Sequence, residues 1–325
     1  MAKLRLIVLI YLHMRHSIVM NQFEEKVLRG GMFSILAKWV IARKGIVYGV
    51  VYDQYFERAL HKRIVDINEL GDSYGSKYLQ SDLNNSFGNV LDDLNSDKLV
   101  LFSGTPCQIS GLKSFLGKEY SNLICVDIIC HGVASPEIWK LYIQELKQEY
   151  GTAVKSVNFR DKSTGWRECS LCVDFKNNKQ YIKKHSDDPY MQLFLNNYTL
   201  RPSCYHCSFK TINRVSDFTI ADFWGIEKVE PEMDDNKGIS LLIIHSPKGH
   251  LILQEVEKKY VCKKVDLNSA INSNTAMLKS VVEPDNRKRY FRLVRIKGFK
   301  AGYVFFKKEN LKICCRMRIK RIIRN

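Results

Sequence analysis

The first 150 residues alternate between short apolar runs and stretches whose apolar residues lie three or four positions apart. Apolar runs of strand length predict buried strands, and the wider spacing predicts helices with one buried face. The predicted strands are Ile46–Tyr52, Lys98–Ser103 and Asn122–Cys130, and the predicted helices are Met32–Arg43, Gln108–Leu116 and a third that Ser135 caps and Pro136 opens. This alternation indicates α/β order in the first half.

From Lys155 the pattern changes to short strands around turns, which favours antiparallel pairing. The predicted strands are Ser156–Arg160, Cys169–Phe175, Lys179–Lys183, Phe218–Trp224 and Ile239–His245. The expected fold class is therefore α+β, with a mixed α/β first half packed against an antiparallel-rich second half. No repeat or low-complexity linker separates the halves, so a boundary near residue 150 is soft.

Composition adds a contrast between body and tail. Of 325 residues, 45% are hydrophobic and 26% charged, as in ordinary globular proteins. The net charge is +17, yet fifteen Lys and Arg and one acidic residue lie between Arg287 and Asn325, which leaves +14 there and +3 elsewhere. The sequence thus predicts a nearly neutral body with a basic helical C-terminal tail.

These patterns divide the chain into an atypical segment 1–13, a main domain 14–260 and a basic C-terminal region 261–325. Lys3 and Arg5 precede a short apolar stretch, but no small-residue cleavage site follows, so export is not expected. No apolar run reaches the roughly 18–20 residues of a membrane helix. Ten cysteines in a chain with regular cores indicate reduced thiols or metal ligands, and hence a cytoplasmic protein.

The sharpest local motif is Cys204-Tyr-His-Cys207, because two intervening residues let both sulfurs face one metal from a single turn. Alone it fits zinc, an iron–sulfur cluster or a redox dithiol. Cys107 ends a predicted strand and opens a helix, where backbone N–H groups favour thiolate and the anionic sulfides of a cluster. Cys130 ends the next predicted strand. If the two strands are neighbours, all four cysteines can form one site.

The other cysteines have plainer expectations. Three lie inside predicted strands and are expected in the core, one is expected to pack, and two in the tail are unassigned: Cys125, Cys169 and Cys172; Cys262; and Cys314 and Cys315. His131 and His206 each neighbour a better cysteine ligand, so hydrogen bonding near the site is expected of them rather than ligation.

At these residues the sequence resembles a known family, the beta subunits of coenzyme F420 hydrogenases and dehydrogenases. The motifs that carry the resemblance are Ser103-Gly-Thr-Pro-Cys-Gln108, Cys130-His-Gly132, Arg201-Pro-Ser-Cys-Tyr-His-Cys207 and Ala221-Asp-Phe-Trp-Gly225. Two further motifs look like its bacterial branch, namely Gly75-Ser-Lys-Tyr-Leu-Gln-Ser81 and Asn158-Phe-Arg-Asp-Lys-Ser-Thr-Gly-Trp166. The resemblance covers roughly residues 14–260.

The resemblance implies a flavoprotein that binds FAD and a 4Fe-4S cluster and transfers electrons between them and a soluble substrate or cofactor. By the same resemblance Cys107, Cys130, Cys204 and Cys207 become cluster ligands. Residues expected to contact flavin or substrate are Gly30, Gly31, Lys77, Tyr78, Arg160 and Lys162. Paired glycines before a helix would let a pyrophosphate approach free N–H groups. The catalytic residues and the substrate stay unknown, and polysaccharide or cell-envelope synthesis is a setting taken from family context alone.

Two departures from the family pattern change the expectation. Many relatives begin with a ferredoxin-like domain, whereas the first cysteine here is Cys107. Electrons are therefore expected to reach the site from a separate protein such as a ferredoxin. In addition, Leu28-Arg29 stands where relatives have a serine-rich lead into Gly30-Gly31.

Two further hypotheses concern binding. Zinc also accepts four thiolates, so a zinc-stabilised binding module with a basic nucleic-acid- or membrane-contacting tail is the alternative function. The tail has few interleaved aromatic residues and the body has no recognised nucleic-acid motif, which disfavours nucleic acid. Alternating apolar and basic residues from Leu311 to Arg324 instead predict contact with an anionic membrane surface, at the inner face of the membrane.

Overall fold

The computed structural model describes residues 6–11, 22–163, 165–234, 236, 238–256 and 261–323, and only the backbone for 6–11, 22–30, 261 and 313–323. Its largest element is a nine-stranded sheet in the order β12-β1-β11-β10-β6-β5-β2-β3-β4. The strands are β12 (Val261–Lys264), β1 (Leu6–Tyr11), β11 (Ser240–Ile244), β10 (Phe218–Asp222), β6 (Leu123–Ile128), β5 (Val100–Gly104), β2 (Ile46–Tyr52), β3 (Ala59–Ile64) and β4 (Ser81–Asp82).

The centre of this sheet is parallel, because β2, β5, β6 and β10 run in one direction. Alternate residues of these strands face two layers of helices, as the two-residue period of a strand requires. On one face Val47, Leu101 and Ile124 pack against α1 (Gln22–Ala42) and α7 (Pro247–Val256). On the other face Tyr48 and Phe102 pack against α2 (Ser86–Asn95) and α3 (Pro106–Leu116).

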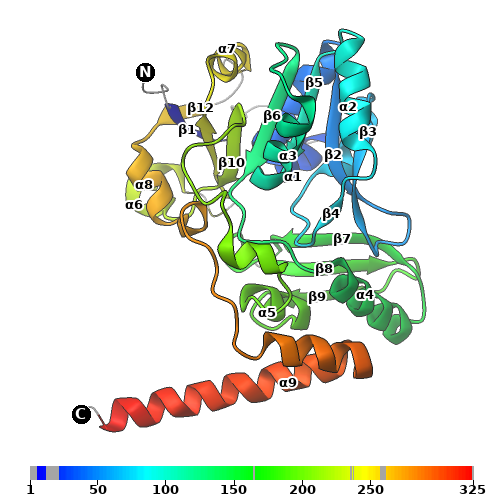
Figure 1. Ribbon diagram of the computed structural model, residues 1–325, viewed down its shortest axis with the longest axis vertical. Helices are drawn as coiled ribbons and strands as arrows, with labels where there is room; N and C mark the ends of the chain where they lie inside the picture. The colour runs from blue at the N-terminus through cyan, green and yellow to red at the C-terminus, as the bar shows by residue number, and fades with distance from the viewer. Residues whose placement is uncertain are drawn as a thin grey trace.

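A second, antiparallel sheet contains β7 (Val154–Asp161), β8 (Ser170–Phe175) and β9 (Gln180–Lys184). Figure 1 shows this small sheet below the large one, with α4 (Pro136–Tyr150), α5 (Pro189–Leu195) and α9 (Arg287–Ile323) beneath it. The remaining short helices are η1 (Ile67–Ser73), η2 (Pro202–His206), α6 (Ile226–Val229), η3 (Pro231–Met233), α8 (Leu267–Asn272) and η5 (Thr275–Met277).

The basic C-terminal helix α9 is partly a core element. Tyr290, Val294, Phe299 and Phe306 are buried in the cluster formed with α4, α5 and the small sheet. The helix changes direction at Gly298, whose φ of 81° is not helical. Beyond this packed portion, α9 extends past the body toward the C-terminus (Figure 1).

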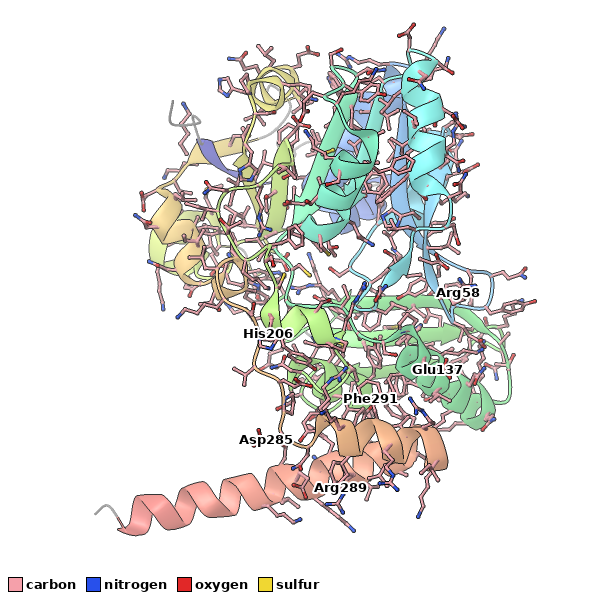
Figure 2. The ribbon with its side chains drawn as sticks, in the orientation of Figure 1. Arg58, Glu137, His206, Asp285, Arg289 and Phe291 are labelled. Carbon is pink, nitrogen blue, oxygen red and sulfur yellow. The ribbon has the colours of Figure 1, made fainter. Side chains whose placement is uncertain are left out.

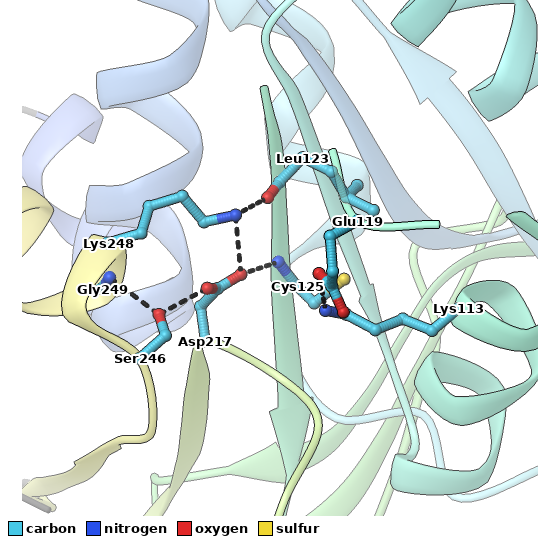
Figure 3. A network of polar contacts seen from close by, with 8 residues as sticks. All are labelled: Lys113, Glu119, Leu123, Cys125, Asp217, Ser246, Lys248 and Gly249. Carbon is cyan, nitrogen blue, oxygen red and sulfur yellow. Dashed lines mark hydrogen bonds and ion pairs between the residues drawn. The ribbon is translucent and has the colours of Figure 1, made fainter. Parts of the chain in front are cut away.

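Strand β10 comes from the second half of the chain, yet it pairs in parallel with β6. A buried carboxylate at its amino end explains this placement. Asp217 accepts hydrogen bonds from the Cys125 N–H at 2.8 Å and the Ser246 hydroxyl at 2.5 Å, and it lies 3.5 Å from Lys248 Nζ (Figure 3). Lys248 also donates to the carbonyl of Leu123. Asp217 therefore joins β6, β10 and the start of α7.

The expected α+β class is confirmed, with a mixed sheet, an antiparallel sheet and a C-terminal helix. Within the atypical segment 1–13, Leu6–Tyr11 forms β1 between β11 and β12, while residues 1–5, 12 and 13 lie outside the described residues. The sequence pattern did not predict β1, nor the parallel pairing of β10. Among the helices described, none is long and apolar enough to cross a membrane.

Candidate functional site

Cys107 stands at the carboxyl end of β5, where α3 begins. The Thr105 hydroxyl lies 3.1 Å from Cys107 Sγ, and the Thr105 backbone N–H donates to the side-chain oxygen Oε1 of Gln108 at 2.9 Å. The Gln108 amide in turn donates to the Ser81 hydroxyl at 2.9 Å. These hydrogen bonds fix the turn that carries Cys107, and the Cys107 side chain is exposed.

Cys130 follows β6, two residues beyond its last residue Ile128. The strands β5 and β6 are hydrogen-bonded neighbours, so the predicted adjacency of Cys107 and Cys130 at one sheet edge is confirmed. Lys210 donates its ammonium to the carbonyl oxygens of Cys130, His131 and Ala276. The positively charged Lys210 side chain therefore lies against the backbone at Cys130.

The segment that carries Cys204 is joined to the loop after Cys130 by backbone pairing. Ala134 and Leu200 form an isolated bridge, and the Arg201 N–H donates to the carbonyl of Val133 at 2.9 Å. A Cβ on Gly132 would lie 3.0 Å from Leu200 Cδ1 and 3.4 Å from Cys204 Cβ. Only glycine allows the two loops to approach this closely without displacement.

Cys107, Cys130, Cys204 and Cys207, called here the four-cysteine group, interact electrostatically with one another. Burial is the main cause that raises the pKa of Cys130 to about 12, and the other three thiols raise it further while Lys210 opposes them. Burial also raises the pKa of Cys204, against a lowering hydrogen bond from the Val133 backbone. Three segments far apart in sequence therefore bring four thiols into one neighbourhood.

A cavity of about 650 Å³ adjoins this group and is lined by Cys107, Cys204 and Cys207. Arg58 and His206 also line it, and Figure 2 shows His206 on η2 between the two sheets. As arranged, no three or more His, Cys, Asp or Glu side chains in the described part of the chain form a site that could hold a metal ion. The sulfurs are thus neighbours without single-ion geometry.

Other cysteines occupy the positions expected of them. Cys125 is fully buried, and Cys169 and Cys172 are each 5% exposed. Cys169 lies just before β8 and is 3.5 Å from His185 Nδ1. Cys262 is partly buried against the core, and the side chains of Cys314 and Cys315 lie outside the described residues.

Two of the residues predicted to contact flavin, Tyr78 and Arg160, meet beside the carboxyl end of β10. Arg160 Nη1 donates to the Tyr78 hydroxyl at 3.0 Å, and Arg160 Nη2 lies 2.8 Å from Asp222 Oδ2. The guanidinium also lies 5.4 Å from the ring centroid of Trp224. Burial alone would lower the pKa of Arg160, but Asp222 and Tyr78 outweigh it and raise the pKa. Tyr78, Arg160, Asp222 and Trp224 are called the Arg160 cluster.

Two aromatic rings, Phe194 and His131, connect the Arg160 cluster to the four-cysteine group. The Phe194 ring lies 5.1 Å from the Tyr78 ring and 5.2 Å from the His131 ring, centroid to centroid. His131 follows Cys130 directly and hydrogen-bonds Asn197 through Nε2 at 2.8 Å. The two regions therefore belong to one continuous set of contacts.

Gly31 lies inside α1 at a kink, with φ of +49°. A Cβ there would lie 2.8 Å from the Ser240 hydroxyl, and Ser240 pairs with Asp222 across β10 and β11. Gly31 is thus near the Arg160 cluster through β11. Gly30 also belongs to α1, and the structure describes only its backbone.

The two lysines predicted to contact flavin or substrate, Lys77 and Lys162, do not belong to the Arg160 cluster as the contacts define it. Lys77 Nζ donates to the carbonyl of Tyr74 at 3.1 Å and lies 5.6 Å from the Tyr52 ring centroid. Burial lowers its pKa to about 8, against a raising effect of Asp72. Lys162 is exposed, two residues after Arg160. Lys77 therefore lies near the Tyr52 ring, whereas Lys162 is at the surface.

The sequence pattern alone predicted no site role for Lys210, Asp222, Trp224 or Thr105. Asp222 and Trp224 stood within the Ala221–Gly225 motif that carried the resemblance, and Thr105 stood within Ser103–Gln108. Lys210 had one usable signal, a basic residue three positions after Cys207. Its position over the Cys130 carbonyl depends on how three loops meet, which the spacing does not show.

Comparison with known proteins identifies a family and a structural neighbour. Residues 97–270 match the family described as the C terminus of the coenzyme F420 hydrogenase/dehydrogenase beta subunit. A chain of the F420-reducing NiFe hydrogenase complex from Methanosarcina barkeri is similar in structure, with a TM-score of 0.52 and 11% identity over 90% of this chain and 92% of that chain. At that identity the likeness concerns the fold alone. No curated protein is a significant match to the sequence.

Proposed function

Because the chain belongs to the coenzyme F420 hydrogenase/dehydrogenase beta subunit family, we propose that it is an oxidoreductase with one 4Fe-4S cluster on the four-cysteine group and an FAD beside it. The observation that carries this proposal is the convergence of the four thiols. They come from the loops after β5 and β6 and from η2 with the residue that follows it, and backbone pairing joins the Cys204 segment to the loop after Cys130. Four cysteines from three separate segments at one sheet edge are more than packing requires.

Family membership, rather than the number of cysteines, favours a cluster over one zinc ion. Four thiolates can bind either group, so the ligand count does not distinguish them. The adjoining cavity leaves space beside Cys107, Cys204 and Cys207.

Residues around the thiols have roles that do not depend on the cluster. Lys210 places one positive charge next to Cys130 and Cys207, and it binds three carbonyl oxygens that fix the loops. The Thr105 hydroxyl and the Val133 backbone contact the sulfurs of Cys107 and Cys204. Such contacts stabilise thiolate and set the reduction potential of a bound cluster.

The FAD part of the proposal rests on the Arg160 cluster. Arg160 Nη2 pairs with Asp222 at 2.8 Å, and the buried Trp166 indole N–H lacks a hydrogen-bond acceptor among the described residues. Gly31 provides a backbone position with no side chain, next to Ser240. Cationic and N–H donors beside a glycine suit the phosphates of a dinucleotide.

A bound cluster supplies single-electron transfer, and a bound flavin connects that transfer to two-electron chemistry. The protein's own contribution is to hold the two regions close together, with the Phe194 and His131 rings between them. Exposed Cys107 provides an approach for a separate electron-transfer protein, such as a ferredoxin. A small-molecule substrate would then react at the flavin, in a cytoplasmic setting.

The deciding experiment is anaerobic purification of wild type, Cys204→Ser and Cys169→Ser, followed by iron, sulfide and visible absorbance measurements. We expect brown wild-type protein, and at least about a tenfold loss of iron and sulfide in Cys204→Ser. Cys169→Ser is the matched control, because Cys169 is equally a cysteine but faces His185. Full iron and sulfide in Cys204→Ser would refute the ligand assignment.

The same preparation tests the alternative function. A colourless wild-type protein with one zinc ion per chain would support the zinc-stabilised binding module and reject the redox proposal. The observation in favour of zinc is the two-residue spacing of Cys204 and Cys207, which zinc sites share.

The FAD proposal needs its own variant. Arg160→Leu should weaken FAD binding by about tenfold or more, measured by flavin fluorescence titration, because a charge-assisted contact is lost. Arg167→Leu is the control, since Arg167 is half-exposed and pairs with Asp234 and Glu227. Equal FAD affinity of wild type and Arg160→Leu would exclude Arg160 from the flavin site.

A further inference from the structure

The part of α9 that follows Gly298 has two distinct faces. Phe299, Phe305 and Phe306 point into the core, where they are 2%, 9% and 1% exposed. The Phe306 ring packs edge-on against Tyr198 with centroids 5.2 Å apart. This face attaches the helix to the body.

The opposite face presents apolar and basic side chains together. Val304 is 52% exposed and Leu311 is 65% exposed. They lie two helical turns apart on the same side of α9. Lys300, Lys307 and Lys308 are exposed and fall on the same side, because they lie four or three positions from these apolar residues. The structure thus leaves an apolar stripe between lysines uncovered.

The lysines of this outward face have little neighbouring negative charge. No carboxylate within the described residues forms an ion pair with Lys300, Lys307 or Lys308. The nearby acid Glu309 is already bonded to Lys312 and Asn286, and Glu145 accepts from the Lys300 backbone N–H. The outward face is therefore strongly positive.

We propose that this outward face of α9 lies on an anionic lipid bilayer. Lysines at the rim of the stripe would meet lipid headgroups, and Val304 and Leu311 would enter the boundary of the acyl chains. A nucleic acid would satisfy the lysines and leave the apolar stripe in water, so the mixture favours lipid over a polyanion. The helix extends past the body, and the sequence alternates apolar and basic residues from Leu311 to Arg324.

Vesicle flotation of the full chain tests this proposal. The probes are phosphatidylcholine vesicles with and without about one third phosphatidylserine, since anionic lipid attracts basic segments. The variants are Lys300→Gln with Lys307→Gln and Lys308→Gln, and Val304→Ser with Leu311→Ser. The matched control replaces three exposed lysines of the body, Lys44, Lys118 and Lys179, by Gln.

Neutralising the three lysines of α9 should weaken vesicle binding about a hundredfold, at about fivefold for each basic residue near the surface. The apolar variant should lose about tenfold, and the body control should bind like wild type. High salt should weaken wild-type binding in the same direction.

Three outcomes would overturn the proposal. They are failure of wild type to float with anionic vesicles, a loss of affinity in the body control as large as that of the α9 lysine variant, and full binding by the apolar variant. In the last case, equal affinity of wild type and the apolar variant for a single-stranded oligonucleotide would assign the lysines to nucleic acid instead. Thermal unfolding of each variant checks that these surface substitutions leave the fold intact.

Discussion

The two ends of the paired strands β6 and β10 carry buried polar groups in opposite states. At the amino end of β10, the Asp217 carboxylate has a partner for each oxygen, in the Cys125 N–H, the Ser246 hydroxyl and the Lys248 ammonium. At the carboxyl end of β6, the Cys130 thiol has a raised pKa and three like neighbours. Only Lys210 offsets them.

This difference separates structure from function. A network whose members are all satisfied, as at Asp217, stabilises one arrangement of strands. The Cys130 and Cys204 thiols, whose ionisation burial disfavours, add little to stability by themselves, and proteins keep such conflicts mainly at functional sites. The comparison therefore supports a binding role at the carboxyl end and a structural role at the amino end.

The largest expected change in stability comes from removing Asp217 at the amino end of β10. Asp217→Ala should lower the free energy of unfolding by about 3 kcal/mol, because it leaves the Cys125 N–H buried without its acceptor and removes the partner of Ser246 and of partly exposed Lys248. Urea denaturation measures the change. Glu119→Gln is the control within the same network drawn in Figure 3, since Glu119 is 81% exposed and should change stability by less than about 0.5 kcal/mol. Similar losses in both variants would contradict the structural role of Asp217.

A second prediction concerns Asp127, which is 1% exposed and lies between the two ends. It accepts from the Thr219 hydroxyl at 2.5 Å and lies 4.0 Å from Arg214. Burial raises the pKa of Asp127 to about 6, with Arg214 opposing. The folded protein then binds more protons than the unfolded chain between about pH 4 and 6, so this group lowers stability as the pH rises through that window.

Asp127→Asn removes this titration while Arg214 stays in place. Relative to wild type, the variant should gain about 2–3 kcal/mol in free energy of unfolding between pH 4 and pH 7, from roughly two pKa units. Denaturation curves at several pH values give the difference. A constant difference across that range would show that Asp127 titrates normally in the fold.

The smallest effect sharpens the contrast at the carboxyl end. Lys210→Met should lower the midpoint potential of the bound cluster by roughly 40 mV, because a nearby positive charge worth about 1 kcal/mol no longer favours the added electron. Redox titration by electron paramagnetic resonance measures it. Lys228→Met, an exposed lysine on α6, is the control and should leave the potential unchanged. An unaltered potential in Lys210→Met would show that Lys210 only holds the loops together through its hydrogen bonds and does not tune the cluster.

Much of the local structure was predictable from residue pattern. The expected strand Ile46–Tyr52 is confirmed to the residue, and the strands predicted at Lys98–Ser103 and Asn122–Cys130 form as β5 and β6 with slightly different ends. Period-two burial and helical spacing are local properties, so they survive whatever the rest of the chain does. The assignment of the four cysteines as ligands stays a prediction.

The sequence by itself determined the central strands and several of the helices, that the C-terminal region is basic, and which cysteines stand at strand ends. Tertiary structure alone decided that β10 returns beside β6, that Lys210 reaches the Cys130 carbonyl, and that half of α9 is core while its outward face is not. The physical reason is range. Periodicity reports the surroundings of a few neighbouring residues, whereas these placements depend on groups such as Asp217 and Cys125 that lie 92 positions apart in the chain.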